Sequence, residues 1–267
     1  MEEPVILARA ENGVGRLTLN RPKQRNAMSP EMAGLLFEHI IQQENDPQIR
    51  CIVLDGAGGS FIAGGDVKSW GRLTAMTPEE RGDDFRIRMA QAKPLIEFIG
   101  TMTKPFIVAP RGFSAGAGIG FVLGADFVIA DDTAKFLFAN IRMSLIPDLG
   151  ITYYLPRLVG PRKAMRLTLL GEQIDAAQAL ALGIVDEVVA PDALEDAITR
   201  LTGTLAAMPA KALAETKRLL RHSRYNSLSD QLSEENEGLA VCAEEADFIE
   251  AITAFSEKRP PRFGQSS

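Results

Sequence analysis

The pattern that most limits the fold of this chain is its change of character along the sequence. Short apolar runs alternate with helical segments over the first two thirds, and helical patterns dominate the remainder. The runs at 49–55 and 105–110 predict buried strands, because both are short and rich in β-branched residues. Ser29 and Pro30 form a helix start, with a capping hydroxyl followed by proline at the first helical position, and this helix is predicted to reach Asn45. The order of elements predicts an α/β core with a helical extension.

Weaker patterns predict the remaining elements. The runs at 5–9 and 14–19 predict a hairpin, because Asn12-Gly13 between them favours a tight turn. The polar stretch at 68–84 is predicted to be a mobile segment that precedes a helix. In the last third, 184–189 is the one strand that we expect.

Composition narrows the class of protein. The formal charge of −6 and the pI near 5.2 argue against a general nucleic-acid binder or a membrane-surface protein. No apolar run approaches the ~20 residues of a membrane span. The two cysteines, Cys51 and Cys242, lie far apart without a CxxC partner, so neither a disulfide framework nor a thiolate metal site is indicated. A reducing cytoplasm is the predicted location.

The histidines exclude several kinds of catalysis. His39 and His222 are the only two in the chain, and neither has the sequence context of a Ser-His-Asp triad or of an HExxH zinc motif. We therefore expect no metal site. A reaction catalysed by this chain has to use carboxylates and backbone groups.

Two glycine-rich segments each follow an apolar run. In 61–66, FIAGGD, small residues allow another backbone or a ligand to approach closely, and Asp66 is well placed to cap a following helix. In 112–120, GFSAGAGIG, free amides at a helix N-terminus can receive negative charge. A tight turn and structural glycine packing are the alternative interpretations. A dinucleotide fingerprint fails, because Phe121 occupies the last glycine position, and no P-loop lysine follows. Together the segments suggest an oxyanion hole with donors from two parts of the chain.

Five motifs, in this order, resemble those of the crotonase (enoyl-CoA hydratase/isomerase) superfamily, in the style of the phenylacetate-pathway isomerases that act on ring-epoxide and enoyl-CoA thioesters. The motifs are RPKQRNAM (21–28), FIAGGD (61–66), GFSAGAGIG (112–120), LIPDLG (145–150) and AFSEKRPPRF (254–263). The resemblance covers nearly the whole chain. It implies a crotonase-type spiral of ββα units over 1–205 and, over 206–267, helices that form homotrimers, sometimes paired into hexamers, and that cap the CoA.

The resemblance also implies the site. The oxyanion donors would be the backbone amides of Gly65 and Ala117, and no cofactor is expected beyond the acyl-CoA thioester that serves as substrate. The family usually has glycine at the second position, and alanine keeps the amide unless the backbone there needs a positive φ. Residues implied to contact substrate or CoA are Arg25, Ala63, Gly64, Asp66, Lys68, Gly116, Asn140, Phe255 and Lys258.

The carboxylates depart from the hydratase pattern. Hydratases of this family use two glutamates, and the matching positions here are Gly120 and Asn140, neither of which can exchange a proton. One acid remains, Asp148. In isolation Pro147-Asp148 is ordinary turn chemistry, but the family's dienoyl-CoA and ring-epoxide isomerases have an aspartate at this position.

The sequence therefore predicts an enoyl-CoA isomerase in which Asp148 moves the proton, with a pKa raised by apolar neighbours such as Phe138 and Leu145. One alternative is a hydratase that uses Asp148 alone, with water positioned by Asn140. Another is a non-catalytic CoA- or RNA-binding homologue, although the basic residues between 211 and 224 fit an exposed helix face better. Dehalogenation is disfavoured, because Lys93 stands where that group has a histidine.

Overall fold

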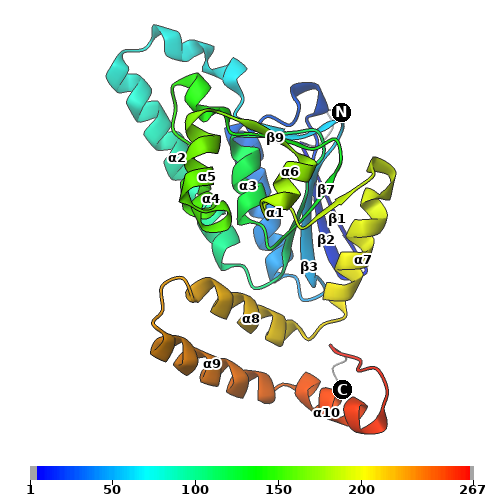
Figure 1. The fold of residues 1–267 in the computed structure, drawn as a ribbon. Helices are drawn as coiled ribbons and strands as arrows, with labels where there is room; N and C mark the ends of the chain where they lie inside the picture. The colour runs from blue at the N-terminus through cyan, green and yellow to red at the C-terminus, as the bar shows by residue number, and fades with distance from the viewer. Residues whose placement is uncertain (1–4, 265–267) are drawn as a thin grey trace.

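The structure, a computed structural model, describes residues 5–264 and is built on two sheets (Figure 1). The first sheet has the order β1 (Ile6–Glu11), β2 (Val14–Leu19), β3 (Cys51–Gly56), β5 (Phe106–Ala109), β7 (Phe127–Asp131) and β10 (Glu187–Val189). The second has the order β4 (Ser60–Ala63), β6 (Phe113–Ala115), β8 (Lys135–Leu137) and β9 (Gln173–Asp175). Among the paired strands of the described residues, β1–β2 and β8–β9 are antiparallel and the other pairs are parallel.

Helices account for most of the remaining described residues. The α-helices are α1 (Pro30–Asn45), α2 (Pro78–Thr101), α3 (Ala117–Gly124), α4 (Ile151–Val159), α5 (Pro161–Leu169), α6 (Ala176–Ala181), α7 (Leu194–Ala206), α8 (Ala210–His222), α9 (Leu228–Ala243) and α10 (Ala246–Glu257). The 3-10 helices are η1 (Pro22–Gln24), η2 (Val67–Ala75), η3 (Ala139–Met143) and η4 (Pro191–Ala193). No helix in the described range has the length and apolarity that a membrane crossing requires.

The chain alternates between the two sheets in repeated ββα units. Each unit places one strand in the first sheet and the next strand in the second before a helix follows: β3 and β4 precede α2, β5 and β6 precede α3, and β7 and β8 precede α4. The central strands β3 and β5 of the first sheet are buried along their whole length, as the continuous apolar runs predict. This winding confirms the predicted α/β spiral.

The helix start at Ser29 and Pro30 and the turn at Asn12-Gly13 form as the sequence predicts. The Ser29 side chain accepts a hydrogen bond from the Met32 amide at 3.2 Å, and α1 ends at Asn45. Asn12 and Gly13 both adopt positive φ in the turn between β1 and β2.

Two predictions about secondary structure were wrong. The stretch at 68–84 is largely helical, because Thr77 and Glu80 form a capping box that begins α2. A second late strand, β9, pairs with β8, and its three residues were too few for a recognisable period. The strand expected at 184–189 forms only from Glu187 onward.

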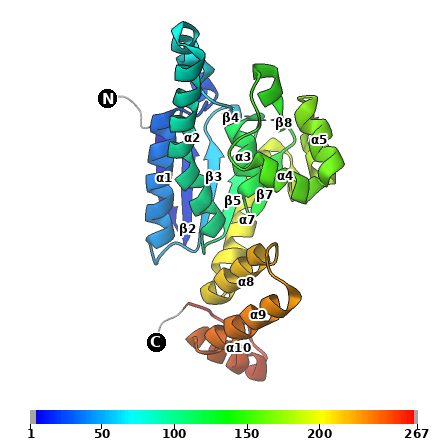
Figure 2. The same ribbon diagram turned by 90° about the vertical axis from the view of Figure 1, so that its left-hand side faces the viewer.

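The three C-terminal helices lie beyond one end of the core (Figures 1 and 2). Asp126 anchors α8 there, with ion pairs to Lys217 at 2.6 Å and to Arg221 at 2.9 Å. The basic residues of α8 are therefore not the uniformly exposed face that we predicted, because these two point toward the core. Residues 1–4 of the predicted core region 1–205 lie outside the described residues. So do residues 265–267 of the predicted helical region 206–267.

Candidate active site

The two glycine-rich segments meet at the ends of neighbouring parallel strands. Ala63 of β4 pairs with Ala115 of β6, so the residues that follow them leave the sheet side by side. Gly64 and Gly116 have φ values of +102° and +47°, which disfavour any other residue. A Cβ on Gly116 would lie 3.4 Å from the Gly64 Cα. The two turns are thus in direct backbone contact.

Each turn leaves one amide unused by the backbone. Over residues 5–264, the amides of Gly65 and Ala117 donate to no main-chain carbonyl. Ala117 is the first residue of α3, where an unpaired amide is normal, and its φ is not positive, so alanine is compatible with this position. The predicted donors exist as free amides at adjacent turns.

The loop from Arg21 to Met28 lies against the first turn. The Met28 amide donates to the Gly64 carbonyl at 2.8 Å, and the Asp66 amide donates to the Met28 carbonyl at 3.2 Å. Arg25 is exposed, and its carbonyl accepts from Ala63 at 3.1 Å. The loop that carries Arg25 therefore forms part of the frame around Gly65.

Asn26 is a structural residue that the sequence reasoning did not single out. Its side chain is fully buried and donates to the carbonyls of Ala57 and Ser60 at 3.0 and 2.8 Å. It also accepts from the Arg21 amide at 2.8 Å, and its φ is +53°. The indication of this role in the sequence was an asparagine in a predicted loop, because asparagine tolerates a left-handed backbone better than most residues.

The predicted helix cap at Asp66 is wrong. Asp66 does precede η2, but its side chain makes no capping hydrogen bond. The carboxylate instead pairs with the Arg21 guanidinium at 3.1 Å, across the junction between the loop and the turn. The Asp66 carboxylate therefore pairs with the Arg21 side chain instead of accepting from the backbone amides of η2. Lys68 is exposed on η2.

Asp148 lies in a strained turn ahead of α4. Leu149 and Gly150, which follow it, have φ values of +48° and +82°. The Asp148 carbonyl accepts from the Ile151 amide at 3.0 Å, which fixes the turn to the start of the helix. The side-chain atom Oδ1 is buried and has no hydrogen-bond partner among the described residues. A buried carboxylate oxygen without a partner is unusual, and a catalytic role is one of the explanations for it.

Burial dominates the titration of Asp148. It raises the pKa of the carboxyl above its ordinary value of 3.8, against weaker lowering effects from its own backbone amide and from the Asn140 side chain. The direction of the predicted shift is confirmed. Such a shift is common among groups that exchange protons, because it brings the pKa closer to neutral pH.

Leu149 fills the space next to one of the two missing glutamate positions. A Cβ on Gly120 would lie 2.9 Å from both the Cβ and the carbonyl oxygen of Leu149. Gly120 lies one turn after Ala117 in α3, so this contact brings the Asp148 turn against the helix that presents the Ala117 amide. The Asp148 turn therefore occupies the space that a glutamate side chain at position 120 would need.

Asn140 supports the same turn from η3. Its Nδ2 donates to the Ile146 carbonyl at 3.2 Å, and its own carbonyl accepts from the Leu145 amide at 3.1 Å. The side chain is thus already engaged by the backbone ahead of Asp148. Across the described residues, no three His, Cys, Asp or Glu side chains are grouped to hold a metal ion.

Phe255 and Lys258 are not brought to this site by their own chain. Phe255 is 86% exposed, and Lys258 ends α10 with a φ of +57°. Figures 1 and 2 place α10 beyond the end of the core opposite to the sheet that contains β4. In one chain these two residues therefore lie at the other end of the molecule from β4, which Gly65 follows.

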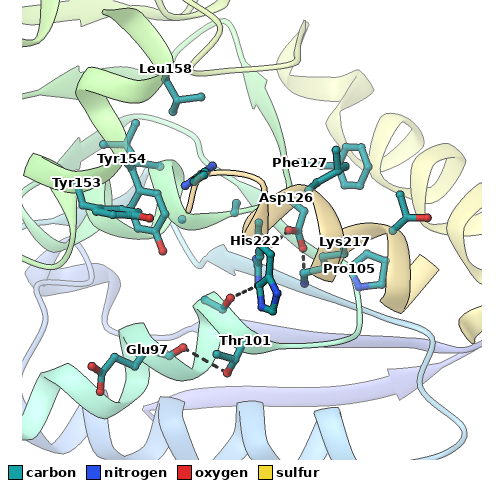
Figure 3. A pocket seen from close by; sticks show the side chains of 18 of the residues that line it. Glu97, Thr101, Pro105, Asp126, Phe127, Tyr153, Tyr154, Leu158, Lys217 and His222 are labelled. Carbon is teal, nitrogen blue, oxygen red and sulfur yellow. Dashed lines mark hydrogen bonds and ion pairs between the residues drawn. The ribbon is translucent and has the colours of Figure 1, made fainter. Parts of the chain in front are cut away.

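A large cavity lies at the other end of α3. It has a volume of about 910 Å³ and is bounded by the ends of α2, α3 and α4 and by α8. Figure 3 shows Asp126 and Lys217 facing each other there, with Tyr153 and Tyr154 on the far side. Because its walls include Leu123 and Gly124 and neither Gly65 nor Asp148, this cavity is separate from the candidate site.

Comparison with known proteins identifies the class. Residues 9–266 match the family Enoyl-CoA hydratase/isomerase. The chain is 38% identical to 1,2-epoxyphenylacetyl-CoA isomerase of Escherichia coli K12, with 97% of each chain covered. It is 30% identical to Crotonyl-CoA hydratase of Syntrophomonas wolfei, with 98% of each covered. The crystal structure of an enoyl-CoA hydratase from Polaromonas sp. JS666 superposes with a TM-score of 0.89, at 32% identity and with 97% and 99% covered.

The fold and these matches define an acyl-CoA enzyme of the crotonase superfamily. The chain belongs to the enoyl-CoA hydratase/isomerase family. Relatives of similar identity carry the names of isomerases and of hydratases, so the matches establish the family and are shared by both reactions.

Proposed function

We propose that this chain is an enoyl-CoA isomerase that shifts a carbon–carbon double bond in an acyl-CoA thioester. The observation that carries the proposal is Asp148, a half-buried carboxylate whose Oδ1 is buried without a partner, set beside a helix whose glutamate position is a glycine packed against Leu149. One carboxylate suffices for isomerisation, because the proton that it removes is returned to the same molecule.

In the proposed reaction, one proton moves between two carbons of the acyl group. The thioester oxygen accepts hydrogen bonds from the amides of Gly65 and Ala117. The Asp148 carboxylate takes a proton from the carbon at one end of the three-carbon unit, and the electron pair of that C–H bond moves into the conjugated enolate. The protonated Asp148 then returns the proton to the other end, and the double bond forms in its new place. Each oxyanion donor is worth about 2.7–4 kcal/mol in comparable enzymes.

The CoA moiety is proposed to lie along Arg25 and the segment 63–68, near the exposed cations Arg25 and Lys68. The nucleotide end would meet Phe255 and Lys258 of another copy. This arrangement requires an oligomer, which we propose to be a homotrimer or a pair of trimers. The exposed apolar side chains of α8, α9 and α10 support it, because exposed apolar surface gathered on neighbouring elements marks interaction sites. These side chains are Leu220, Leu228, Leu239, Ile249 and Phe255.

The second candidate is a hydratase that relies on Asp148 alone, favoured by relatives such as Crotonyl-CoA hydratase. Water addition also needs a group that positions the water, and Asn140 of η3, which contacts the Asp148 turn, is the candidate for this role. Its Nδ2 already donates to Ile146. The structure therefore offers less support for this reaction than for proton return.

Two measurements test the proposal: the ratio of isomerised to hydrated products, and the turnover of a variant without the Asp148 carboxylate. Incubation with 2-enoyl- and 3-enoyl-CoA thioesters should give isomerised products in excess over hydrated ones. Asp148→Asn keeps the size of the side chain and removes the proton acceptor, so isomerase turnover should fall at least ~100-fold with little change in acyl-CoA affinity. Near-normal turnover of this variant would show that Asp148 is a turn residue, and hydration as fast as the best isomerisation would favour the second candidate.

A further inference from the structure

One residue of the loop at 21–28 bonds to the peptides on both sides of Gly65. The Met28 amide donates to the Gly64 carbonyl, and the Met28 carbonyl accepts from the Asp66 amide. These two bonds form a parallel β-bridge between Met28 and Gly65. In such a bridge the amide and carbonyl of the residue between the two bonded peptides point away from the partner segment. The loop therefore sets the direction of the Gly65 amide.

The neighbours of β4 show where that amide points. Strand β4 is the edge strand of its sheet and pairs with β6, while the Ala63 amide at its end donates to the Arg25 carbonyl of the loop. The loop and β6 thus lie on opposite edges of β4. An amide that points away from the loop points toward the turn that carries Ala117. The ring edge of Trp70 lies on a third side, because a Cβ on Gly65 would be 2.8 Å from Trp70 Cζ2.

The side chain of Arg21 connects the two segments of this bridge. Its guanidinium donates to the Ala27 carbonyl at 2.8 Å and to the Asp66 carboxylate at 3.1 Å. Ala27 precedes Met28 and Asp66 follows Gly65, so one planar, rigid group bonds to both segments next to the bridge. The side chains of Arg21 and Asp66 are 21% and 18% exposed, which limits the screening of their charges by water and salt.

The backbone of Arg21 is fixed as well. Its amide donates to Asn26 Oδ1, and its carbonyl accepts from the amides of Gln24 and Asn26, both at 3.0 Å. Asn26 is fully buried and also bonds to the segment between β3 and β4. The guanidinium is thus held at its base by the loop and at its tip by the turn.

Resting on the proposed function, we infer that Arg21 is a positioning residue: it holds the bridge between Met28 and Gly65 so that the Gly65 amide points at the thioester oxygen. Arg21 does not touch the substrate. Its ion pair also neutralises the Asp66 carboxylate, which lies one residue from the oxyanion donor. An unpaired negative charge there would oppose the charge that develops on the thioester oxygen.

Kinetics of Arg21 variants test this role. Arg21→Met keeps an unbranched apolar side chain and removes both bonds. Its isomerase kcat should fall at least about tenfold, because loss of one oxyanion donor costs roughly 100–1,000-fold and a misdirected donor costs part of that. KM should change by less than about threefold, since the affected hydrogen bond acts mainly in the transition state. Arg21→Lys keeps the charge without the fork of donors and should lie between the two.

Arg200→Met is the matched control, because it removes an exposed ion pair with Glu187 and should keep the wild-type kcat. A wild-type kcat in Arg21→Met, or a loss of kcat/KM that lies entirely in KM, would overturn the positioning role.

A double variant tests whether Arg21 acts through Asp66. Asp66→Asn removes the same ion pair from the other side. Because both residues belong to one link, adding Asp66→Asn to Arg21→Met should lower kcat no further than Arg21→Met alone. Effects that multiply would refute a shared link. The double variant contains no unpaired carboxylate, so it carries the spectroscopic test below if Arg21→Met by itself does not fold.

A measurement without turnover separates this role from the proposed reaction. Butyryl-CoA labelled with carbon-13 at the thioester carbonyl would be bound at saturation, checked by calorimetry, and its C=O stretch recorded by difference infrared spectroscopy. Hydrogen bonds from the oxyanion donors weaken the carbonyl bond. The frequency should therefore fall on binding to the wild type and return most of the way to the free value in Arg21→Met. An identical stretch in both proteins refutes the inference. A shift that depends on Arg21 in a wild type without isomerase turnover would reject the proposed reaction and keep the positioning role.

Discussion

At the scale of single residues, Asp148 serves two opposing requirements. Burial makes the carboxylate a stronger base, because it raises the pKa, and the same burial destabilises the ionised form in the folded protein. Hydrogen bonding from its own backbone amide and from Asn140 offsets only part of this cost, and Oδ1 itself has no partner among the described residues. Retaining such a group is understandable where its chemistry is used.

This conflict predicts how stability depends on pH. Because the folded-state pKa of Asp148 is raised, its contribution is most favourable below the ordinary value of 3.8 and is lost as pH rises through the folded value. Asp148→Asn does not titrate, so at about pH 7.5 it should unfold at a higher temperature than the wild type, with the gap closing toward about pH 4. Thermal unfolding at both pH values measures this. A variant less stable than the wild type at the higher pH would contradict it.

A second residue-scale prediction concerns Gly120. The contact distance of 2.9 Å to Leu149 leaves no room for a methyl group, so Gly120→Ala should lower the free energy of unfolding by about 1–3 kcal/mol. Gly34 in α1 is the matched control, since nothing lies within 4 Å of its Cβ position. Gly34→Ala should stabilise by about 0.5–1 kcal/mol. Urea unfolding compares the two, and equal effects would mean that the Asp148 turn is loosely packed.

At the scale of elements, α8 is held to the core by charge as well as by apolar contact. The side chains of Lys217 and Asp126 are only 10% and 17% exposed. Arg221 also donates to the carbonyls of Ile99 and Gly100 at the end of α2, at 3.0 and 2.5 Å. These bonds satisfy acceptors that a helix end leaves free.

Asp126→Asn should therefore loosen α8. Removing the shared carboxylate leaves two half-buried cations without their anion, and the free energy of unfolding should fall by about 1.5–3 kcal/mol. Protease cleavage between α7 and α8 should become faster. Glu97→Gln, which breaks the exposed pair with Lys93, is the control and should change stability by less than about 0.5 kcal/mol. Similar losses in both variants would show that the Asp126 cluster does not anchor the helix.

Element by element, the sequence could predict what depends on local chemistry. Ser29 and Pro30 began α1 as expected, and the apolar runs became β3 and β5. The predictions that failed depend on contacts between distant parts of the chain. Strand β9 forms because it pairs with the edge of β8. The Asp66 side chain pairs with Arg21, which lies 45 positions away in the sequence. The contacts of Leu149 with Gly120 and of Trp70 with Gly65 were likewise invisible, because nothing local specifies which distant side chain faces a glycine.

At the scale of the whole molecule, the residues predicted to form the site are divided between two ends of the chain. The turns with Gly65, Ala117 and Asp148 belong to the core, whereas Phe255 and Lys258 lie on α10 at the opposite end. If these two residues hold the nucleotide end of CoA, every working site combines a core with the α10 of a neighbour. Activity would then depend on association.

Mixing two defective variants tests this arrangement. Asp148→Asn lacks the base but keeps its α10, while a chain with Phe255→Ala and Lys258→Ala keeps the base but cannot hold CoA in its neighbour. In mixed oligomers formed by co-expression, some intact cores would meet intact α10 helices, and random assembly of equal amounts in a cyclic trimer should restore about one quarter of wild-type activity at low substrate. Each variant alone should remain near its own basal rate. A mixture no more active than the average of its components would place Phe255 and Lys258 outside the site of any neighbour, and light scattering on the same samples would show whether the oligomer had formed.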